Sequence, residues 1–201
     1  MVGLVFLGAP GSGKGTQADY LSSKLSIKKI STGDLFRSQI KNKTNIGLKL
    51  KAIIDSGNLV PDEIVMETVK AALNEIKSDG FILDGFPRTI NQAIQFDKFL
   101  KCLVLERFKT IYLNVSEKIL IERLTNRRIC GNCGENFHLV FKKSVLGNRC
   151  DKCQGLLIQR EDDRIEEIKA RFKIFNKENE SILAFYNERG LLVEVNGERD
   201  I

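Results

Sequence analysis

No apolar run in this sequence approaches the roughly 20 residues that a membrane-spanning helix needs. The first residues, Met1–Val5, also lack the basic region and the cleavage site of a secretory signal. Internal repeats and low-complexity segments are missing too, which excludes repeat architectures and long disordered linkers. We therefore expect a folded cytoplasmic protein without a membrane partner.

Lysine and arginine never form a block of five or more residues, although the net charge is +6 and the sequence pI is about 9.1. This scatter argues against a nucleic-acid-binding tail and favours small phosphorylated molecules as the anionic partners. Hydrophobic residues make up 42% of the chain and charged residues 29%, as in an ordinary globular protein. A length of 201 residues fits one main core with small insertions.

Short apolar runs are each followed by a turn and a helical pattern. Residues 2–7 precede a helix from Lys14, residues 81–83 precede a helix beyond Thr89, and residues 110–115 precede a helix over 117–127. A further strand is expected at 191–195. Repeated strand–helix units of this kind predict an α/β fold with a parallel sheet core covered by helices.

Two stretches interrupt this rhythm. Residues 31–60 read as a helical insertion that ends near Gly57 and Pro61, and residues 126–163 carry four of the five cysteines. A long charged helix over about 163–189 then returns the chain to the core. We expect a core formed by 1–30, 61–125 and 164–201, the insertion 31–60, and a lid over 126–163.

The segment Gly8–Thr16 has the spacing of a P-loop, in which Gly8 is followed by four residues and then by Gly13 and Lys14. Gly15 stands where the strict motif has Ser or Thr, and Thr16 follows it. Inward-facing backbone N–H groups and the following helix dipole suit phosphate, and Lys14 can reach the outer phosphates. The alternative is a glycine-rich turn that only joins a strand to a helix.

Asp84 closes the second apolar strand, where the carboxyl ends of parallel strands meet the same crevice. We therefore expect Asp84 and Thr16 near a magnesium ion. Taken alone, Asp84 would be read as a turn residue.

The four lid cysteines form two pairs, Cys130 with Cys133 and Cys150 with Cys153, separated by sixteen residues. This spacing predicts a structural zinc site with four thiolate ligands, in place of a hydrophobic core that the lid is too polar to build. Two disulfides, free thiols and bound iron are the alternatives. The fifth cysteine, Cys102, is expected to be a small buried hydrophobe.

Three segments in this order and spacing, Gly8–Thr16, Ser31–Arg37 and Asp84–Thr89, resemble the adenylate kinase family. The resemblance extends to arginines and acids later in the chain, so that it covers essentially the whole sequence: Arg123, Arg127, Arg128, Arg160, Asp162, Asp163 and Arg171. It implies a monomer that reversibly transfers phosphate from ATP to AMP with magnesium and without a general base, forming ADP. Some bacterial members carry a zinc lid.

The resemblance also implies roles for individual residues. The catalytic set would be Lys14, Arg88, Arg123, Arg160 and Arg171. The ATP site would consist of Gly11, Ser12, Gly13, Lys14, Gly15, Thr16, Arg123, Arg127, Asn136, Phe137 and Arg199. The AMP site would consist of Thr32, Arg37, Asn58, Leu59, Val60, Gly85, Phe86, Pro87, Arg88, Gln92, Arg160 and Arg171.

Three observations qualify this assignment. A kinase for UMP, CMP or GMP on the same scaffold is the nearest rival, although Thr32 and Gln92 favour AMP. A zinc-ribbon protein that binds nucleic acid would explain the basic pI and the cysteines, but not the arginines. The chain stops at Ile201, where adenylate kinases usually continue into a closing helix, so we expect a shortened chain or an unusual member. His138 has no assigned role, and Arg164 is expected on the surface.

Overall fold

The computed structural model describes residues 1–56, 58–76, 79–103, 105 and 107–199. Gly57, where the sequence suggested that the insertion ends, and the terminal pair Asp200 and Ile201 lie outside the described residues. None of the described helices combines the length and the apolar content of a membrane-spanning segment.

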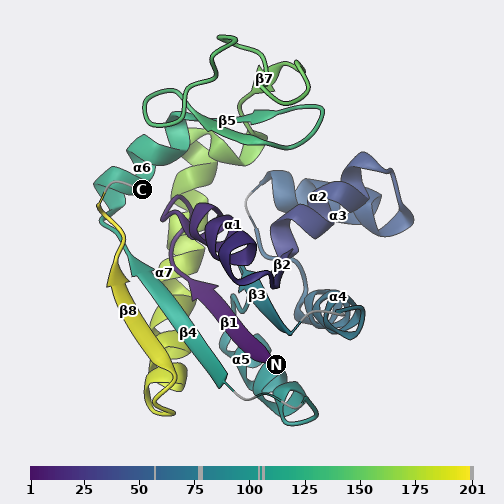
Figure 1. The fold of residues 1–201 in the computed structure, drawn as a ribbon, viewed down its shortest axis with the longest axis vertical. Coiled ribbons are helices and arrows are strands. Elements are labelled where there is room, and N and C mark those ends of the chain that lie inside the picture. Colours follow the sequence, from purple (N-terminus) through teal and green to yellow (C-terminus); the bar gives the residue numbers. More distant parts are fainter. Residues whose placement is uncertain (57, 77–78, 104, 106, 200–201) are drawn as a thin grey trace.

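A five-stranded parallel sheet in the order β2-β3-β1-β4-β8 forms the centre of the molecule (Figure 1). The predicted parallel sheet is therefore confirmed. In register, Asp84 pairs with Phe6 on one side and Ser31 on the other, so three strands end at one edge. The strands are β1 (Val2–Leu7), β2 (Lys28–Ser31), β3 (Gly80–Asp84), β4 (Arg107–Asn114) and β8 (Leu192–Asn196).

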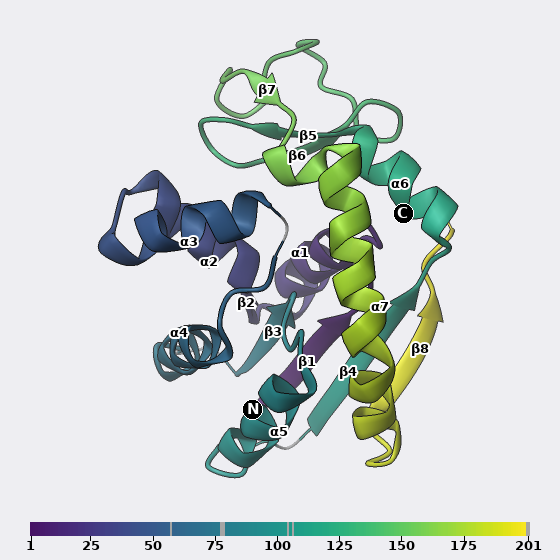
Figure 2. The same cartoon turned by 180° about the vertical axis from the view of Figure 1, so that it is seen from behind.

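Helices cover both faces of this sheet, with α1 on one face and α5 and α7 on the other (Figures 1 and 2). Neighbouring side chains of β1 point to opposite faces of the sheet and therefore pack in different hydrophobic clusters. Val5 packs in the large cluster with Phe96 and Tyr186, and Phe6 packs with Ala18 of α1. Burial on both faces explains why the central strands read as continuous apolar runs. The covering helices are α1 (Lys14–Leu25), α5 (Ile90–Leu100), α6 (Glu117–Thr125) and α7 (Ile165–Asn187).

The helical character of the insertion is confirmed by α2 (Thr32–Lys41) and α3 (Asn45–Asp55). Ser31 and Thr44 cap these helices by accepting hydrogen bonds from the backbone of Asp34 and Gly47. A Cβ at Gly47 would lie 2.2 Å from the Gln39 backbone oxygen, so glycine allows the two helices to pack closely. Sequence reasoning missed β2 before the insertion and α4 (Asp62–Asn74) after it.

The lid contains a small antiparallel sheet in the order β6-β5-β7. Its strands are β5 (Arg127–Cys130), β6 (Asn136–His138) and β7 (Leu157–Ile158), and the short helix η1 (Glu161–Asp163) leads into α7. The helix expected over 117–127 ends at Thr125, because Arg127 already pairs with His138 in β5. The buried lid cluster consists of Cys130, Phe137 and Cys150, which is too small to act as an independent core.

Candidate functional site

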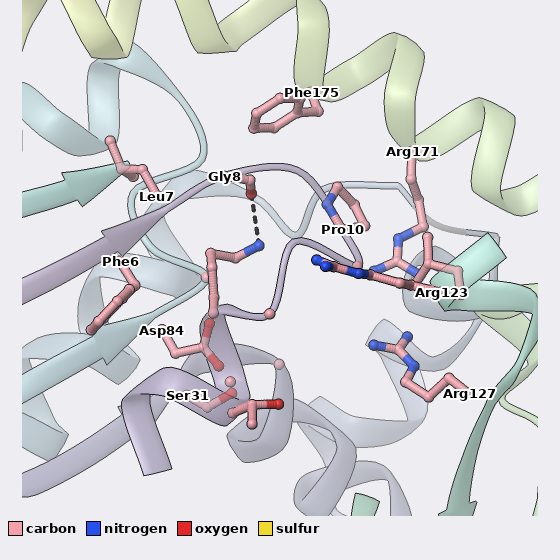
Figure 3. A pocket seen from close by; sticks show the side chains of 18 of the residues that line it. Phe6, Leu7, Gly8, Pro10, Ser31, Asp84, Arg123, Arg127, Arg171 and Phe175 are labelled. Carbon is pink, nitrogen blue, oxygen red and sulfur yellow. Dashed lines mark hydrogen bonds between the residues drawn. The ribbon is translucent and has the colours of Figure 1, made fainter. Parts of the chain in front are cut away.

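One large cavity, of about 610 Å³, lies between the carboxyl edge of the sheet, the insertion, the lid and α7. Its walls bring together residues that are far apart in the sequence. Figure 3 shows Arg123, Arg127 and Arg171 near one another in this cavity, beside the loop that carries Gly8 and Pro10. The remaining predicted ATP-side residues that line it are Gly11, Gly13, Lys14, Gly15, Thr16, Asn136, Phe137 and Arg199.

The glycine-rich loop has the backbone conformation that an anion nest requires. Gly8, Gly11 and Gly13 have φ values of 143°, 86° and 94°, a region that side chains with a Cβ rarely adopt. Gly13 caps α1, and a Cβ at Gly11 would come within 2.9 Å of Leu124. Glycine is therefore required here both for the turn and for close packing against α6.

Lys14 is folded back over this loop. Its Nζ donates hydrogen bonds to the backbone oxygens of Gly8 (2.7 Å, Figure 3) and Ala9 (2.8 Å), and to the hydroxyl of Ser12 (3.3 Å), which is itself buried. Burial lowers the pKa of Lys14 to about 7, with Asp84 opposing the shift and neighbouring arginines reinforcing it. The ammonium is thus held where its charged form gains most from an added anion.

Asp84 and Thr16 both line the large cavity. The Asp84 carboxylate lies 4.0 Å from Lys29 Nζ, and a Cβ at Gly15 would be 3.3 Å from its Oδ2. A carboxylate and a hydroxyl beside a phosphate-binding loop are the oxygen ligands that magnesium prefers. This pair of residues therefore fits the predicted magnesium site.

A second, small cavity of about 50 Å³ adjoins the first between α2, α3 and the start of α5. Most predicted AMP-site residues line it: Thr32, Arg37, Asn58, Leu59, Val60, Gly85, Arg88, Gln92 and Arg171. Pro87 and Arg160 line the larger cavity instead. Phe86 is fully buried and packs edge-to-face on Phe96 at 5.1 Å, so the structure gives it a core position.

Hydrogen bonds fix the turn that carries Arg88. The Nε of Arg88 donates to the Gly85 backbone oxygen (2.7 Å), which also accepts from the Thr32 hydroxyl (3.0 Å). The guanidinium group faces the cavity, and its pKa is lowered to about 10 because the walls remove part of its hydration and other arginines lie nearby. A cation in this position favours an anionic ligand.

Arginines and acids also connect the lid to α7. Arg127 forms a two-pronged ion pair with Asp163, through Nε at 2.8 Å and Nη2 at 2.5 Å, and Asp163 has no exposed surface. Arg171 donates to the backbone oxygen of Asp162 at 2.8 Å, and its Nη1 lies 3.1 Å from the Asp162 carboxylate. These contacts orient guanidinium groups that would otherwise repel one another.

Two further predicted arginines have weaker protein partners. Arg160 Nη2 lies 3.3 Å from Asn136 Oδ1, and burial lowers the pKa of Arg160 to about 9. Arg123 donates to the Gly197 backbone oxygen at 2.9 Å. Arg164 pairs with Glu161 on the exposed surface, as expected.

Sequence reasoning missed several residues at the site. Asp62 accepts hydrogen bonds from three residues near the small cavity. In the sequence it is only an acid in the first turn of a helix, where an acidic side chain is explained by its interaction with the helix dipole. His138 lines the large cavity and stacks on Phe141 with ring centroids 4.7 Å apart. Lys29, which bonds Asp19 at 2.8 Å, also lines it, and no sequence motif indicated this role.

The four lid cysteines lie together, with all four Sγ atoms within 4.8 Å of one another. Two of the separations are 3.4 Å (Cys130 to Cys153) and 3.6 Å (Cys133 to Cys150). A tetrahedral zinc ion with bonds of about 2.3 Å requires sulfur separations of about 3.8 Å, so these residues fit a four-thiolate site. None of the four forms a disulfide bond.

Backbone N–H groups also point at the sulfur atoms of this cluster. Asn132 and Cys133 donate to Cys130 Sγ, and Lys152 donates to Cys150 Sγ, each at 3.4 Å. Such bonds stabilise thiolates, and the bond from Cys133 lowers the pKa of Cys130. The expectation for Cys102 was wrong, because this cysteine is exposed at the end of α5.

Comparison with known proteins agrees with the family resemblance found in the sequence. Residues 6–191 match the sequence profile of the family described as adenylate kinase. The chain is 46% identical to an adenylate kinase of Caldicellulosiruptor bescii over 98% of its own length and 93% of that protein. It is 44% identical to an adenylate kinase of Acetivibrio thermocellus and 43% identical to one of Clostridium botulinum, each over 98% of its own length and 92% of the relative.

Proposed function

The chain belongs to the adenylate kinase family, and we propose that it transfers the terminal phosphoryl group of ATP to AMP through residues of the two adjoining cavities. As a member of this family it is a nucleoside monophosphate kinase that acts on ATP, AMP and ADP. The observation that supports the residue assignment best is the convergence of Lys14, Arg88 and Arg171 on one cavity between the glycine-rich loop and the small pocket.

We propose that ATP occupies the part of the large cavity next to the glycine-rich loop. Its phosphates would lie on the backbone N–H groups of Gly11–Thr16, with Lys14 leaving its loop acceptors for the outer phosphates. Arg123, Arg127 and the lid residues Asn136 and Phe137 would line the nucleoside end, with Arg199 nearby. When bound with ATP, magnesium neutralises charge on the donor phosphates, and Asp84 and Thr16 would hold it.

AMP would occupy the small cavity. Its base would lie among Thr32, Leu59, Val60 and Gln92, with Asn58 and Gly85 forming the surroundings. Phe86 would support this wall from the core, and Pro87 would contact AMP from the side of the large cavity. Its phosphate would reach Arg37 and Arg88, whose guanidinium groups can form forked hydrogen bonds with phosphate oxygens.

Catalysis on this proposal is positioning plus charge neutralisation. Arg160 and Arg171 line the large cavity and would face the space between the two nucleotides, where negative charge would spread over the transferred group. The AMP phosphate is itself the nucleophile and carries no proton that must be removed at neutral pH, so no general base is required. Residues 31–60 and 126–163 would close over the core formed by 1–30, 61–125 and 164–201.

The four lid cysteines would hold zinc as a structural ion. Four thiolates complete a tetrahedral shell and leave no position for substrate, so the ion would stabilise the lid without joining the reaction. We also propose a monomeric, cytoplasmic enzyme.

A nucleotide panel tests this function. Purified protein is mixed with ATP and magnesium and with AMP, UMP, CMP or GMP, and the diphosphate products are measured. We expect rapid ADP formation with AMP and at most a few percent of that rate with the others. A preference for UMP or CMP would assign a pyrimidine kinase, and salt-sensitive nucleic-acid binding without ADP formation would favour the zinc-ribbon alternative.

A further inference from the structure

Gln92 is almost completely buried, with 1% of its surface exposed, and both ends of its carboxamide group are bonded to protein. Its Oε1 accepts a hydrogen bond from the backbone N–H of Arg88 at 2.8 Å. Its Nε2 donates to the carboxylate of Asp62 at 2.6 Å. The same side chain also lines the small cavity.

The two partners determine which way the amide of Gln92 faces. A backbone N–H can only donate, and an ionised carboxylate can only accept, so a flipped amide would oppose like groups at both ends. A buried polar group left without its partner is destabilising, and more so when the group is charged. Gln92 is therefore held in one orientation.

Asp62 is itself held firmly in place. Its two carboxylate oxygens accept from the Thr89 hydroxyl at 3.0 and 3.1 Å, and Oδ2 also accepts from Asn91 Nδ2 at 2.9 Å. Thr89 caps α5 by accepting from the backbone N–H of Gln92. Asp62, at the start of α4, thus ties this helix to the turn that carries Arg88 and Gln92.

With its orientation fixed, the amide of Gln92 has a defined remaining capacity to form hydrogen bonds. Two of its hydrogen-bonding groups are used by protein, which leaves one N–H donor and one oxygen lone pair. Adenine presents an acceptor at N1 and a donor at N6, and a hypoxanthine or guanine base presents the opposite pair at the same positions. An amide that could flip would form both hydrogen bonds with either kind of base. An amide held in one orientation would form both with only one kind.

We propose that Asp62 is a specificity-determining residue that selects the 6-amino purine of AMP by preventing Gln92 from flipping. This inference rests on the proposed function, because it requires the base of AMP to lie in the small cavity. Asp62 acts through Gln92 and has no required contact with the nucleotide, so it is a positioning residue.

The test compares AMP with inosine monophosphate, which reverses the donor and acceptor at these two positions and changes little else. The variants are Asp62→Leu, which removes the acceptor, and Asp62→Asn, which can keep an oxygen toward Gln92. Asp97→Leu is the matched control, because Asp97 lies in α5 and forms an ion pair with Lys101 at 3.7 Å. kcat and KM are measured for both acceptors at saturating ATP.

We expect Asp62→Leu to lower the preference of kcat/KM for AMP over inosine monophosphate at least tenfold, through KM. Asp62→Asn should restore most of the preference, and Asp97→Leu should leave it unchanged. Equal losses with both acceptors would assign Asp62 a purely structural role and overturn the proposal. A wild-type protein that phosphorylates neither acceptor would instead contradict the proposed function.

A second measurement on the wild-type protein covers the case in which Asp62→Leu does not fold. The side-chain amide signals of Gln92 are followed by ¹⁵N–¹H NMR spectroscopy, with assignment from Gln92→Glu. We expect one Nε2 proton to be protected from solvent exchange in the free protein and the other to shift on addition of AMP. Rapid exchange of both protons would show an unrestrained amide and overturn the proposal.

Discussion

The Nζ of Lys41 donates a hydrogen bond of 2.6 Å to the backbone oxygen of Asn132. This bond joins the last turn of α2 to the first cysteine pair of the lid, across 91 positions of sequence. Asn132 also donates its backbone N–H to Cys130 Sγ at 3.4 Å. The AMP-side insertion and the proposed metal site are therefore linked through one residue.

Lys41→Met should weaken the closed arrangement of the insertion and the lid. A single hydrogen bond from an exposed ammonium contributes about 0.5–1 kcal/mol, so KM for AMP should rise about two- to fivefold, with the melting temperature within about 4 °C. Steady-state kinetics measures KM, and thermal unfolding measures the melting temperature. Lys49→Met, on the exposed surface of α3, is the control. An unchanged KM would mean that the contact has no part in closure.

Removal of the lid metal should lower stability more than turnover. A site filled at a thousand times its Kd stabilises the fold by about 4 kcal/mol, which corresponds to roughly 8–16 °C for a chain of this size. Differential scanning calorimetry and an ADP-forming assay below the melting range are run with and without chelator. Cys133→Ser should reproduce the loss, and Cys102→Ser should not. Proportional losses of stability and turnover would contradict a structural role.

The affinity for ATP should depend on pH through Lys14. The pKa of Lys14 is lowered to about 7 in the free protein, and bound phosphate favours the charged ammonium and raises that pKa. Binding should therefore take up protons above pH 7, and affinity should fall as pH rises further. Calorimetric titration at pH 8 in two buffers of different ionisation enthalpy measures the uptake. Lys14→Met should remove the part due to this residue; an identical uptake in the variant would refute the assignment.

Asp163→Asn should destabilise the protein strongly. The variant leaves Arg127 and Arg171 without the fully buried carboxylate that orients them, and breaking a buried ion pair typically costs about 3–5 kcal/mol. Chemical unfolding monitored by circular dichroism measures the difference in the free energy of unfolding between the variant and the wild type. Glu161→Gln, in an exposed pair with Arg164, should change stability by less than about 1 kcal/mol. Equal effects of the two substitutions would show that burial of Asp163 is unimportant.

Patterns with a local physical cause could be predicted from the sequence. The apolar run and glycines around Gly8 predict a buried strand, a nest and a helix, because each depends on neighbours in the chain. The paired cysteines likewise predict a common site, and their sulfur atoms lie within 4.8 Å of one another. The strand Lys28–Ser31 was missed because two of its four residues are lysines, although it pairs with β3 at the edge of the sheet.

The contacts that organise the site could not be predicted in this way. The bond between Asp62 and Gln92 joins residues 30 positions apart, and it depends on how α4 packs beside α5. Lys41 and Asn132 meet only because the insertion and the lid both border the same cavity. Cys102 was expected in the core from its chemistry alone, but the chain turns to the surface at the end of α5. Tertiary geometry decides each of these cases.

The initial rate of ADP formation from ATP, AMP and magnesium, compared between the wild type and Arg88→Ala, tests most directly whether guanidinium groups of this cavity drive phosphoryl transfer. Arg164→Ala, which changes an exposed arginine, is the control. We expect a wild-type turnover that falls by about 10³ or more in Arg88→Ala and at least as far in Lys14→Met, with Arg164→Ala unaffected. An inactive wild type, or near-normal turnover of Arg88→Ala, would contradict the account.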